Sequence, residues 1–377
     1  MLKRLFCLAL ALATFFWLLK VFLLTYYPDF SSYYYGPKFA FSGLNPYLGG
    51  KVFFTPFSYP PIVLLFFTPI SLLPFFVAQK IWIAISIMLL ISVIYLIFSM
   101  YRQDLFSNKA LILYSLVFIS FPLKFSLGMG QINIIVLFLV VLSIYYLHHQ
   151  KYVFSGGIMG LAISLKLFPI LIIPYFIIRK KTKVLAGMFF AMIALFSIAA
   201  IIFPHLNYYF FSNTLPSLLS GWKGDYYNQA VAGFLTREVK NIPLRNGIRY
   251  MIDLLLIAVS FFAIAKQKSV KMEMINLEIG LIIILSILIN SFSWQHHYIW
   301  SILPFLFAFF YITSKELSKY LLIALGISYL LIASNYTYPQ NLPLFFQSHV
   351  LYGGIILWGI NVYLLLYPTH KHKGNHK

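Results

Sequence analysis

The sequence predicts an all-α protein that crosses a membrane many times, and three observations support this prediction. Of its 377 residues, 61% are hydrophobic and only 10% are charged, whereas a soluble domain carries about 25% charged residues. Hydrophobic runs recur along the chain, and most approach the roughly 20 residues that one spanning helix needs. Short clusters of Lys and Arg separate these runs. Allowing for loops, we expect about twelve transmembrane helices.

The cationic clusters predict the orientation of the chain. The net charge is +20, from 28 Lys and Arg against 8 Asp and Glu. Because the cations lie between apolar runs, they are typical of cytoplasmic loops, and we expect no nucleic-acid partner. If the spans alternate as described below, the clusters share the cytoplasmic side with both termini. They lie at 101–109, 179–183, 266–271, 315–319 and 370–377.

The first apolar run, residues 5–25, follows Lys3 and Arg4. It resembles a secretory signal but lacks a small-x-small cleavage site, so we expect a retained anchor. The single cysteine, Cys7, lies within this run. The sequence therefore predicts no internal disulfide and no cysteine-based metal site.

A first external loop, 26–75, follows this anchor. It is rich in Tyr, Pro and Gly, and it carries Asp29, the only acid before Asp104. In its last part, 61–75, prolines interrupt an apolar run, so we expect a broken or re-entrant segment that lies against protein or a wet cavity. A full span there would reverse every later segment and place the basic clusters outside.

The remaining apolar runs alternate outward and inward, and a second external loop covers residues 204–247. We see no internal repeat and expect a single membrane domain, 1–377. The expected spans are 76–99, 110–127, 132–147, 184–203, 248–265, 274–291, 298–312, 320–334 and 350–367.

Lys166 interrupts another apolar stretch, and basic residues mark both ends of that stretch, Lys151 on one side and the 179–183 cluster on the other. We expect two half-spans that meet near Lys166. A lysine at membrane depth is energetically costly, so its side chain should face a cavity or a partner.

Unusual polar and aromatic residues gather on the expected outer face. A carboxylate can accept the proton of an attacking hydroxyl, cations can hold a phosphate leaving group, and Trp and Tyr can stack on sugar rings. This composition favours transfer of a sugar to an acceptor hydroxyl. The candidates are Asp29, Tyr59, Gln131, Asn133, Lys166, Trp222, Asp225, Asn228, Gln229, Arg237, Trp294, His296 and His297.

Several candidates have structural interpretations. Position alone slightly favours Asp29 as a helix N-cap, and Lys166 could be a snorkelling lysine. His296 and His297 could belong to an interfacial aromatic belt. Metal binding by His296 and His297 is less favoured than either the belt or a substrate contact, because adjacent side chains diverge on a helix. Asn228 and Gln229 could be a capping pair.

Six stretches, in order, resemble glycosyltransferase family 87, the polyprenyl-phosphate-mannose-dependent mannosyltransferases of the GT-C superfamily. The likeness covers most of the chain, up to about His297. The stretches are PDFSSYYYGPKFAFSGLNPY, FSYPP followed by LLP and Trp82, GQIN, SGGIMGLAISLKLFP, YNQAVAGFLTR and SWQHH.

The resemblance implies a GT-C-type bundle with re-entrant or juxtamembrane helices in the first external loop. It implies an inverting enzyme that has an extracytoplasmic active site and needs no metal or other cofactor. Asp29 would be the base, and the donor phosphate would be held by Lys166, Arg237, His296 and His297. Many GT-C enzymes carry two adjacent acids in the first loop; here Asp29 stands alone, in agreement with a single-base mechanism.

The sequence thus predicts a hexosyltransferase, with mannose as the expected sugar, in the inner membrane of a bacterium. Its partners would be a polyprenyl-phosphate sugar, a glycan or glycolipid acceptor of the cell envelope, and the bilayer. The alternative is a transporter or flippase of lipid-linked sugars, for which repeats between the two halves would be expected. We assign substrate binding to Tyr59, Gln131, Asn133, Trp222, Asn228, Gln229 and Trp294.

Overall fold

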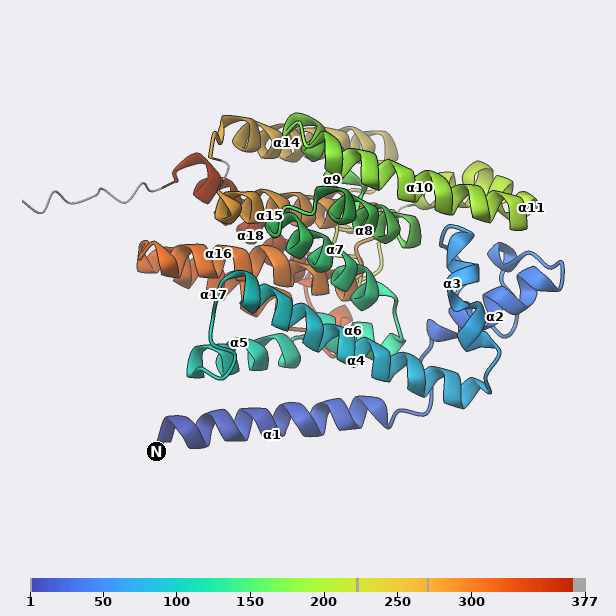
Figure 1. Ribbon diagram of the computed structural model, residues 1–377, viewed down its shortest axis with the longest axis horizontal. Coiled ribbons are helices and arrows are strands. Elements are labelled where there is room, and N and C mark those ends of the chain that lie inside the picture. Colours follow the sequence, from blue (N-terminus) through green and yellow to red (C-terminus); the bar gives the residue numbers. More distant parts are fainter. Residues whose placement is uncertain (1, 222–223, 270, 369–377) are drawn as a thin grey trace, which may run out of the picture. The chain divides into compact units, whose positions relative to one another are not determined.

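The computed structural model describes residues 2–221, 224–269 and 271–368, and these are α-helical with short 3₁₀ and π segments (Figure 1). Within these ranges the only β-type pairing is an isolated bridge between Asn228 and Trp294. The chain divides into two compact units, Met1–Gly221 and Trp222–Lys377, which are described separately below.

The first unit holds twelve α-helices in its described part. In one layer α4, α7, α8 and α10 each pack against the next, and α2 and α3 pack together near the start of α4 (Figure 1). The helices are α1 (Leu2–Phe22), α2 (Phe30–Phe41), α3 (Ile62–Ser71), α4 (Phe75–Met100), α5 (Asn108–Ile119), α6 (Phe121–Met129), α7 (Asn133–His148), α8 (Tyr152–Leu165), α9 (Ile172–Ile178), α10 (Thr182–Ile202), α11 (Pro204–Tyr209) and α12 (Leu215–Ser220).

In the second unit α15 is the central helix, and α14, α16 and α18 pack against it. Nearly every side chain of α15 is buried. On α14 an ion pair joins Arg249 to Asp253 over 3.1 Å, and Arg249 also donates to the Ser291 hydroxyl. The helices are α13 (Val231–Glu238), α14 (Ile242–Lys266), α15 (Met272–Ile289), α16 (Ile302–Ser314), α17 (Lys319–Ala333) and α18 (His349–Leu366).

Six helical segments in the described ranges are long and apolar enough to cross a membrane. The bent pair α5–α6 raises the number to seven. The prediction of a polytopic membrane protein is thus confirmed, whereas a count of about twelve is not. Several expected spans are apolar helices of only 10–17 residues. The six segments are Phe75–Met100, Thr182–Ile202, Ile242–Lys266, Met272–Ile289, Gln295–Ser314 and Leu344–Leu366.

The segment 61–75 forms a single short helix, α3. Its ten residues would extend about 15 Å, half of a hydrocarbon core of about 30 Å. This agrees with a segment that does not span by itself. Pro69, however, lies inside α3 rather than interrupting it, and the break comes at Pro74, which directly precedes α4.

Two expected helices differ from those of the structure. The run 110–127 is two helices that meet at Ser120 with a bend of 54°, because Pro122 occupies the first turn of α6 and has no N–H to continue the helical ladder. The helix expected at 248 begins at Ile242, since the Asn241 side chain accepts the N–H of Leu244 at 3.0 Å. An Asn before a proline-containing first turn is an N-terminal signal.

The expected break at Lys166 is present. α8 ends at Leu165, and Lys166 itself is extended, with φ −150° and ψ 118°. The 3₁₀ turn Phe168–Leu171 and α9 continue the chain. Upstream of the break, α8 crosses α10 so closely that a Cβ on Gly156 would lie 1.9 Å from the Val184 carbonyl oxygen. Gly156 and Gly160 of the SGGIMG stretch therefore permit the close crossing of α8 and α10.

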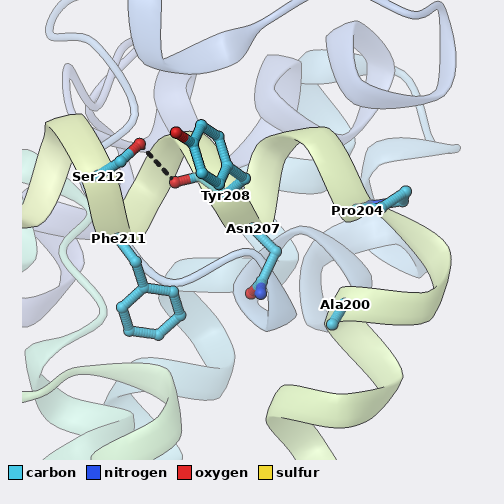
Figure 2. A pocket seen from close by; sticks show the side chains of 6 residues that line it. All are labelled: Ala200, Pro204, Asn207, Tyr208, Phe211 and Ser212. Atoms are coloured by element: carbon cyan, nitrogen blue, oxygen red, sulfur yellow. Dashed lines mark hydrogen bonds between the residues drawn. The ribbon is translucent and has the colours of Figure 1, made fainter.

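A hollow of about 490 Å³ lies where α10 continues into α11 and the π turn Phe210–Thr214. Figure 2 shows its lining, with the Ser212 hydroxyl donating to the Tyr208 carbonyl oxygen. None of the residues predicted for the site is among those that line it, which are Ala200, Pro204, Asn207, Tyr208, Phe211 and Ser212.

Candidate functional site

Asp29 lies directly before the first residue of α2 and is only 7% exposed. It occupies the N-cap position, yet its carboxylate makes no capping hydrogen bond to the helix. Its own backbone N–H donates to the Met129 carbonyl oxygen at 2.9 Å. The capping interpretation therefore does not explain the carboxylate, which is directed to other partners.

The main partner of this carboxylate is Gln131. The side-chain amide of Gln131 donates to Asp29 Oδ2. Its oxygen accepts from the hydroxyls of Tyr33 at 3.0 Å and Tyr59 at 3.1 Å. The two hydroxyls lie 2.7 Å apart. A continuous polar network thus begins at the aspartate and reaches into the core of the first unit.

Gly130 allows Gln131 to reach Asp29. Its φ of +71° lies in the left-handed region, which glycine adopts at little cost. A Cβ there would lie 3.0 Å from the Cβ atoms of both Tyr27 and Phe30. The Trp82 indole fixes the turn by donating to the Gly130 carbonyl oxygen at 2.7 Å. The GQIN stretch and Trp82 therefore form one structural feature.

Lys166 is linked to the same group of side chains by Asn133, the first residue of α7. Its ammonium donates to Asn133 Oδ1 at 2.6 Å and lies 5.6 Å from the centre of the Tyr59 ring. Asn133 is fully buried. Five of the predicted residues are thus brought together in the first unit, namely Asp29, Tyr59, Gln131, Asn133 and Lys166.

The surroundings of Asp29 adjust its acidity. Burial raises the pKa of the carboxyl from 3.8 to about 6. The Gln131 amide, the nearby Lys166 ammonium and the Thr55 hydroxyl act in the opposite direction and limit the rise. At neutral pH the carboxylate is therefore ionised but close to its pKa, which suits a general base.

Tyr33 is a member of this network that the sequence analysis did not single out. It is 1% exposed, and its ring stacks on Phe67 with the centroids 4.6 Å apart. The spacing in the sequence could have identified Tyr33, because Asp29 and Tyr33 are four residues apart and a helix places such positions on one face. The tyrosine-rich composition of the loop concealed this spacing.

In the second unit, Asn228 and Gln229 connect three segments. Asn228 donates to the Ser291 carbonyl oxygen at 3.0 Å and pairs with Trp294 in the isolated bridge. Gln229 donates to the Gln347 carbonyl oxygen at 2.8 Å. Both are fully buried. This arrangement holds the SWQHH turn and the start of α18 against the segment before α13.

Arg237 is also occupied by contacts within the protein. Nη1 donates to the carbonyl oxygens of Asp225 at 2.8 Å and Asn228 at 2.9 Å. Nη2 donates to the Ser348 hydroxyl at 2.8 Å. These bonds give Arg237 a clear structural role, and phosphate binding by it stays a prediction.

His296 and His297 lie in the 3₁₀ segment Gln295–Ser301, with their ring centroids 4.4 Å apart in an edge-to-face arrangement. They are 6% and 7% exposed, which is deeper than an interfacial belt implies. Trp294 stacks on Tyr227. Trp222, a further predicted sugar contact, lies outside the described residues.

Known proteins share parts of this sequence. A polyprenol-phosphate-mannose-dependent α-(1-2)-phosphatidylinositol mannoside mannosyltransferase of Mycobacterium tuberculosis is 23% identical over 299 residues, 72% of this chain and 67% of the relative. A corresponding pentamannoside mannosyltransferase of Mycolicibacterium smegmatis is 24% identical over 260 residues, which cover 66% of this chain and 59% of the relative.

A solved structure also aligns with the fold. ArnT from Cupriavidus metallidurans, crystallised with undecaprenyl phosphate, superposes with a TM-score of 0.47 at 13% identity. The alignment covers 96% of this chain and 76% of ArnT.

The sequence profile of glycosyltransferase family 87 matches residues 57–286, more than half of the chain. The match contains four of the five clustered site residues, and Asp29 lies before its start. The chain therefore belongs to glycosyltransferase family 87.

Proposed function

We propose that this protein is an inverting hexosyltransferase that uses a polyprenyl-phosphate sugar, with mannose as the sugar, on the extracytoplasmic face of the membrane. The observation that carries the proposal is the buried Asp29 carboxylate, held by Gln131 and close to the Lys166 ammonium. Family membership and the donor named in both relatives support the donor class. Family membership also favours a transferase over the transporter alternative.

In the proposed reaction, the acceptor hydroxyl attacks the anomeric carbon of the donor sugar. Its oxygen forms the new glycosidic bond while the bond from the anomeric carbon to the phosphate oxygen breaks. Asp29 takes the hydroxyl proton, and the bonding pair leaves with the polyprenyl phosphate. Lys166 balances the charge that grows on this phosphate. Attack opposite to the leaving group inverts the anomeric centre.

The opposite charges of Asp29 and Lys166 suit them to different roles in the reaction. Asp29 is the carboxylate of this group and can accept the hydroxyl proton, and the Lys166 ammonium is the cation that can face the phosphate. Asn133 orients the ammonium through its 2.6 Å hydrogen bond. Tyr59 presents a half-buried ring beside that ammonium, where a sugar ring can stack.

A donor assay tests the proposal. The purified protein, reconstituted in lipid, is supplied with a set of mannosylated glycolipid acceptors and one donor at a time, which is polyprenyl-phosphate mannose, glucose or arabinose or a nucleotide-linked mannose. We expect transfer from the mannose donor and an inverted linkage in the product. If no polyprenyl-phosphate sugar is consumed, while a nucleotide sugar is, the proposed donor class is wrong.

A further inference from the structure

We infer that Gln131 is a positioning residue, which holds Asp29 in the geometry of a base and is itself fixed by the hydroxyls of Tyr33 and Tyr59. This inference rests on the proposed function and deepens it. It replaces the expected role of Gln131 as a sugar contact with a role exerted through Asp29.

Both ends of the Gln131 side chain are committed to protein atoms. Its nitrogen donates to Asp29 Oδ2, and its oxygen lies within hydrogen-bond distance of both tyrosine hydroxyls. The residue is 7% exposed and Tyr33 is 1% exposed. Little room is left for water to replace a lost contact, so the carboxylate depends on this amide.

The directions of the hydrogen bonds are consistent with one another. The Ile132 backbone N–H donates to the Tyr33 hydroxyl at 3.4 Å, and Tyr33 donates to Tyr59 at 2.7 Å. Tyr59 can then donate its only hydroxyl proton to Gln131, whose amide donates to Asp29. In this series of hydrogen bonds, each group donates to the next one toward the Asp29 carboxylate.

A reversed amide would be unfavourable. It would place the Gln131 oxygen against an ionised Asp29 oxygen, so that two acceptors would face each other without a proton. The two hydroxyls oppose this reversal, because they offer a donor to the amide oxygen where it now lies. The tyrosines therefore act on Asp29 through the orientation of Gln131.

The groups that face Asp29 determine the sign of the expected effect. They are the Gln131 amide, the Lys166 ammonium, the Thr55 hydroxyl and, behind Gln131, the Tyr33 and Tyr59 hydroxyls. The amide stabilises the ionised form, so its removal makes the proton harder to lose. The carboxyl pKa should rise from about 6, and the acid limb of the rate profile should move to higher pH.

The experiment compares wild type with Gln131→Met, which keeps the length of the side chain but removes the donor, and with Gln131→Glu, which replaces the donor by an acceptor. The first readout is ¹³C NMR of protein labelled at the aspartate carboxyls. The chain has four aspartates, so Asp29→Asn assigns the signal of interest. The second readout is the pH dependence of kcat/KM for transfer.

We expect the Asp29 titration of Gln131→Met to move up by about one to two pH units, the value of a lost hydrogen bond to a charge. Gln131→Glu should move it further, and the KM for the donor should stay within twofold. Ser86→Ala is the matched control, because this buried hydroxyl donates to the Trp82 carbonyl oxygen of its own helix. It should leave the titration unchanged.

Tyr59→Phe provides a second, milder variant if Gln131→Met does not fold. It removes one hydroxyl from the amide oxygen and should shift the titration upward by less than one unit. An unchanged titration in the folded variants, with a raised donor KM, would overturn the inference and make Gln131 a substrate contact. Because the NMR titration needs no substrate, a wild type without transfer would instead count against the proposed function alone.

Discussion

Asp29 shows how a buried carboxylate can favour function over stability. Its pKa is raised from 3.8 to about 6 by burial, so the folded protein resists its ionisation. The ionised form therefore destabilises the fold above pH 6, and this cost disappears below about pH 4, where the carboxyl is protonated in both the folded and unfolded states.

The first prediction concerns the variant Asp29→Asn. We expect transfer to fall by about 10²–10⁴, the usual value of a general base. We expect thermal stability at pH 7 to be equal or higher, because a neutral amide replaces a buried charge. Transfer assays and thermal unfolding in the same detergent check both parts. Asp104→Asn, at an exposed acid in a loop, is the control, and wild-type activity in Asp29→Asn would exclude the base.

The pH dependence follows from the same value. A base with a pKa of about 6 is about nine-tenths ionised at pH 7 and about one-tenth ionised at pH 5. We therefore expect kcat/KM to fall tenfold per pH unit below pH 6. A profile of kcat/KM from pH 4.5 to 8 measures this limb. An acid limb near pH 4 would show that Asp29 is not the group that takes the proton.

Lys166 allows a prediction that separates phosphate binding from snorkelling. We expect Lys166→Met to fold as well as wild type, because it removes a cation from an apolar stretch. It should raise the KM for the polyprenyl-phosphate sugar at least tenfold, the value of a lost charged contact. Lys166→Arg should restore part of the affinity, since it keeps the charge but changes its shape.

The control for Lys166 is Lys38→Met. Lys38 is an exposed cation of the segment 26–75, and its ammonium donates to the Tyr34 hydroxyl. Its loss should leave the donor KM unchanged. If both variants behave like wild type in steady-state kinetics, Lys166 is structural, and the phosphate must be held elsewhere.

At the scale of elements, the packing of α8 on α10 depends on glycine. Cβ atoms at Gly156, Gly160 and Gly187 would lie 1.9, 2.4 and 2.1 Å from backbone oxygens of the facing helix. Backbone atoms cannot move aside as a flexible side chain can, so the helices would have to separate. Small residues at such crossings are typical of helix association in membranes.

This crossing gives a prediction with an adjacent control. Gly156→Ala should lower the free energy of unfolding by about 1–3 kcal/mol, the cost of overpacking, and should reduce activity by displacing Lys166. Gly157→Ala should be tolerated, because its Cβ would meet its nearest neighbour, the Gly187 carbonyl oxygen, at an ordinary 3.9 Å. Thermal unfolding and transfer assays compare the two. Equal stability of the variants would contradict the close crossing.

The same elements show what the sequence could predict. Apolar runs of helical length predicted most helices, and an apolar stretch interrupted by Lys166 predicted the break between α8 and α9. The start of α14 was missed because the second external loop was extended to residue 247, although Asn241 and Pro243 form an N-terminal signal. The pairing of Asp29 with Gln131 could not be predicted, since a left-handed turn at Gly130 brings them together across about a hundred residues.

At the scale of the whole molecule, the number of spanning segments has to place the basic clusters on one side of the membrane. The chain has 28 Lys and Arg, and cations are retained on the cytoplasmic side of a membrane. α3 has ten residues, which is too short to span alone, and the expected order of later crossings assumes that it does not span. The expected cytoplasmic side of the basic clusters therefore stays a prediction that rests partly on α3.

The last prediction tests this orientation with single cysteines in a background where Cys7 is replaced by Ser. Lys51 and Asp225, which lie in the two loops expected to be external, are exposed. We expect cysteines there to react with a membrane-impermeant maleimide added to intact cells. Cysteines at Arg102 and Lys180, exposed in the basic clusters, should react only after the membrane is opened. If Asp225→Cys reacts only in opened cells while Lys51→Cys reacts in intact ones, an odd number of crossings separates the two loops. The extracytoplasmic face could then no longer hold both loops, and a full span over 61–75 would be the first explanation to test.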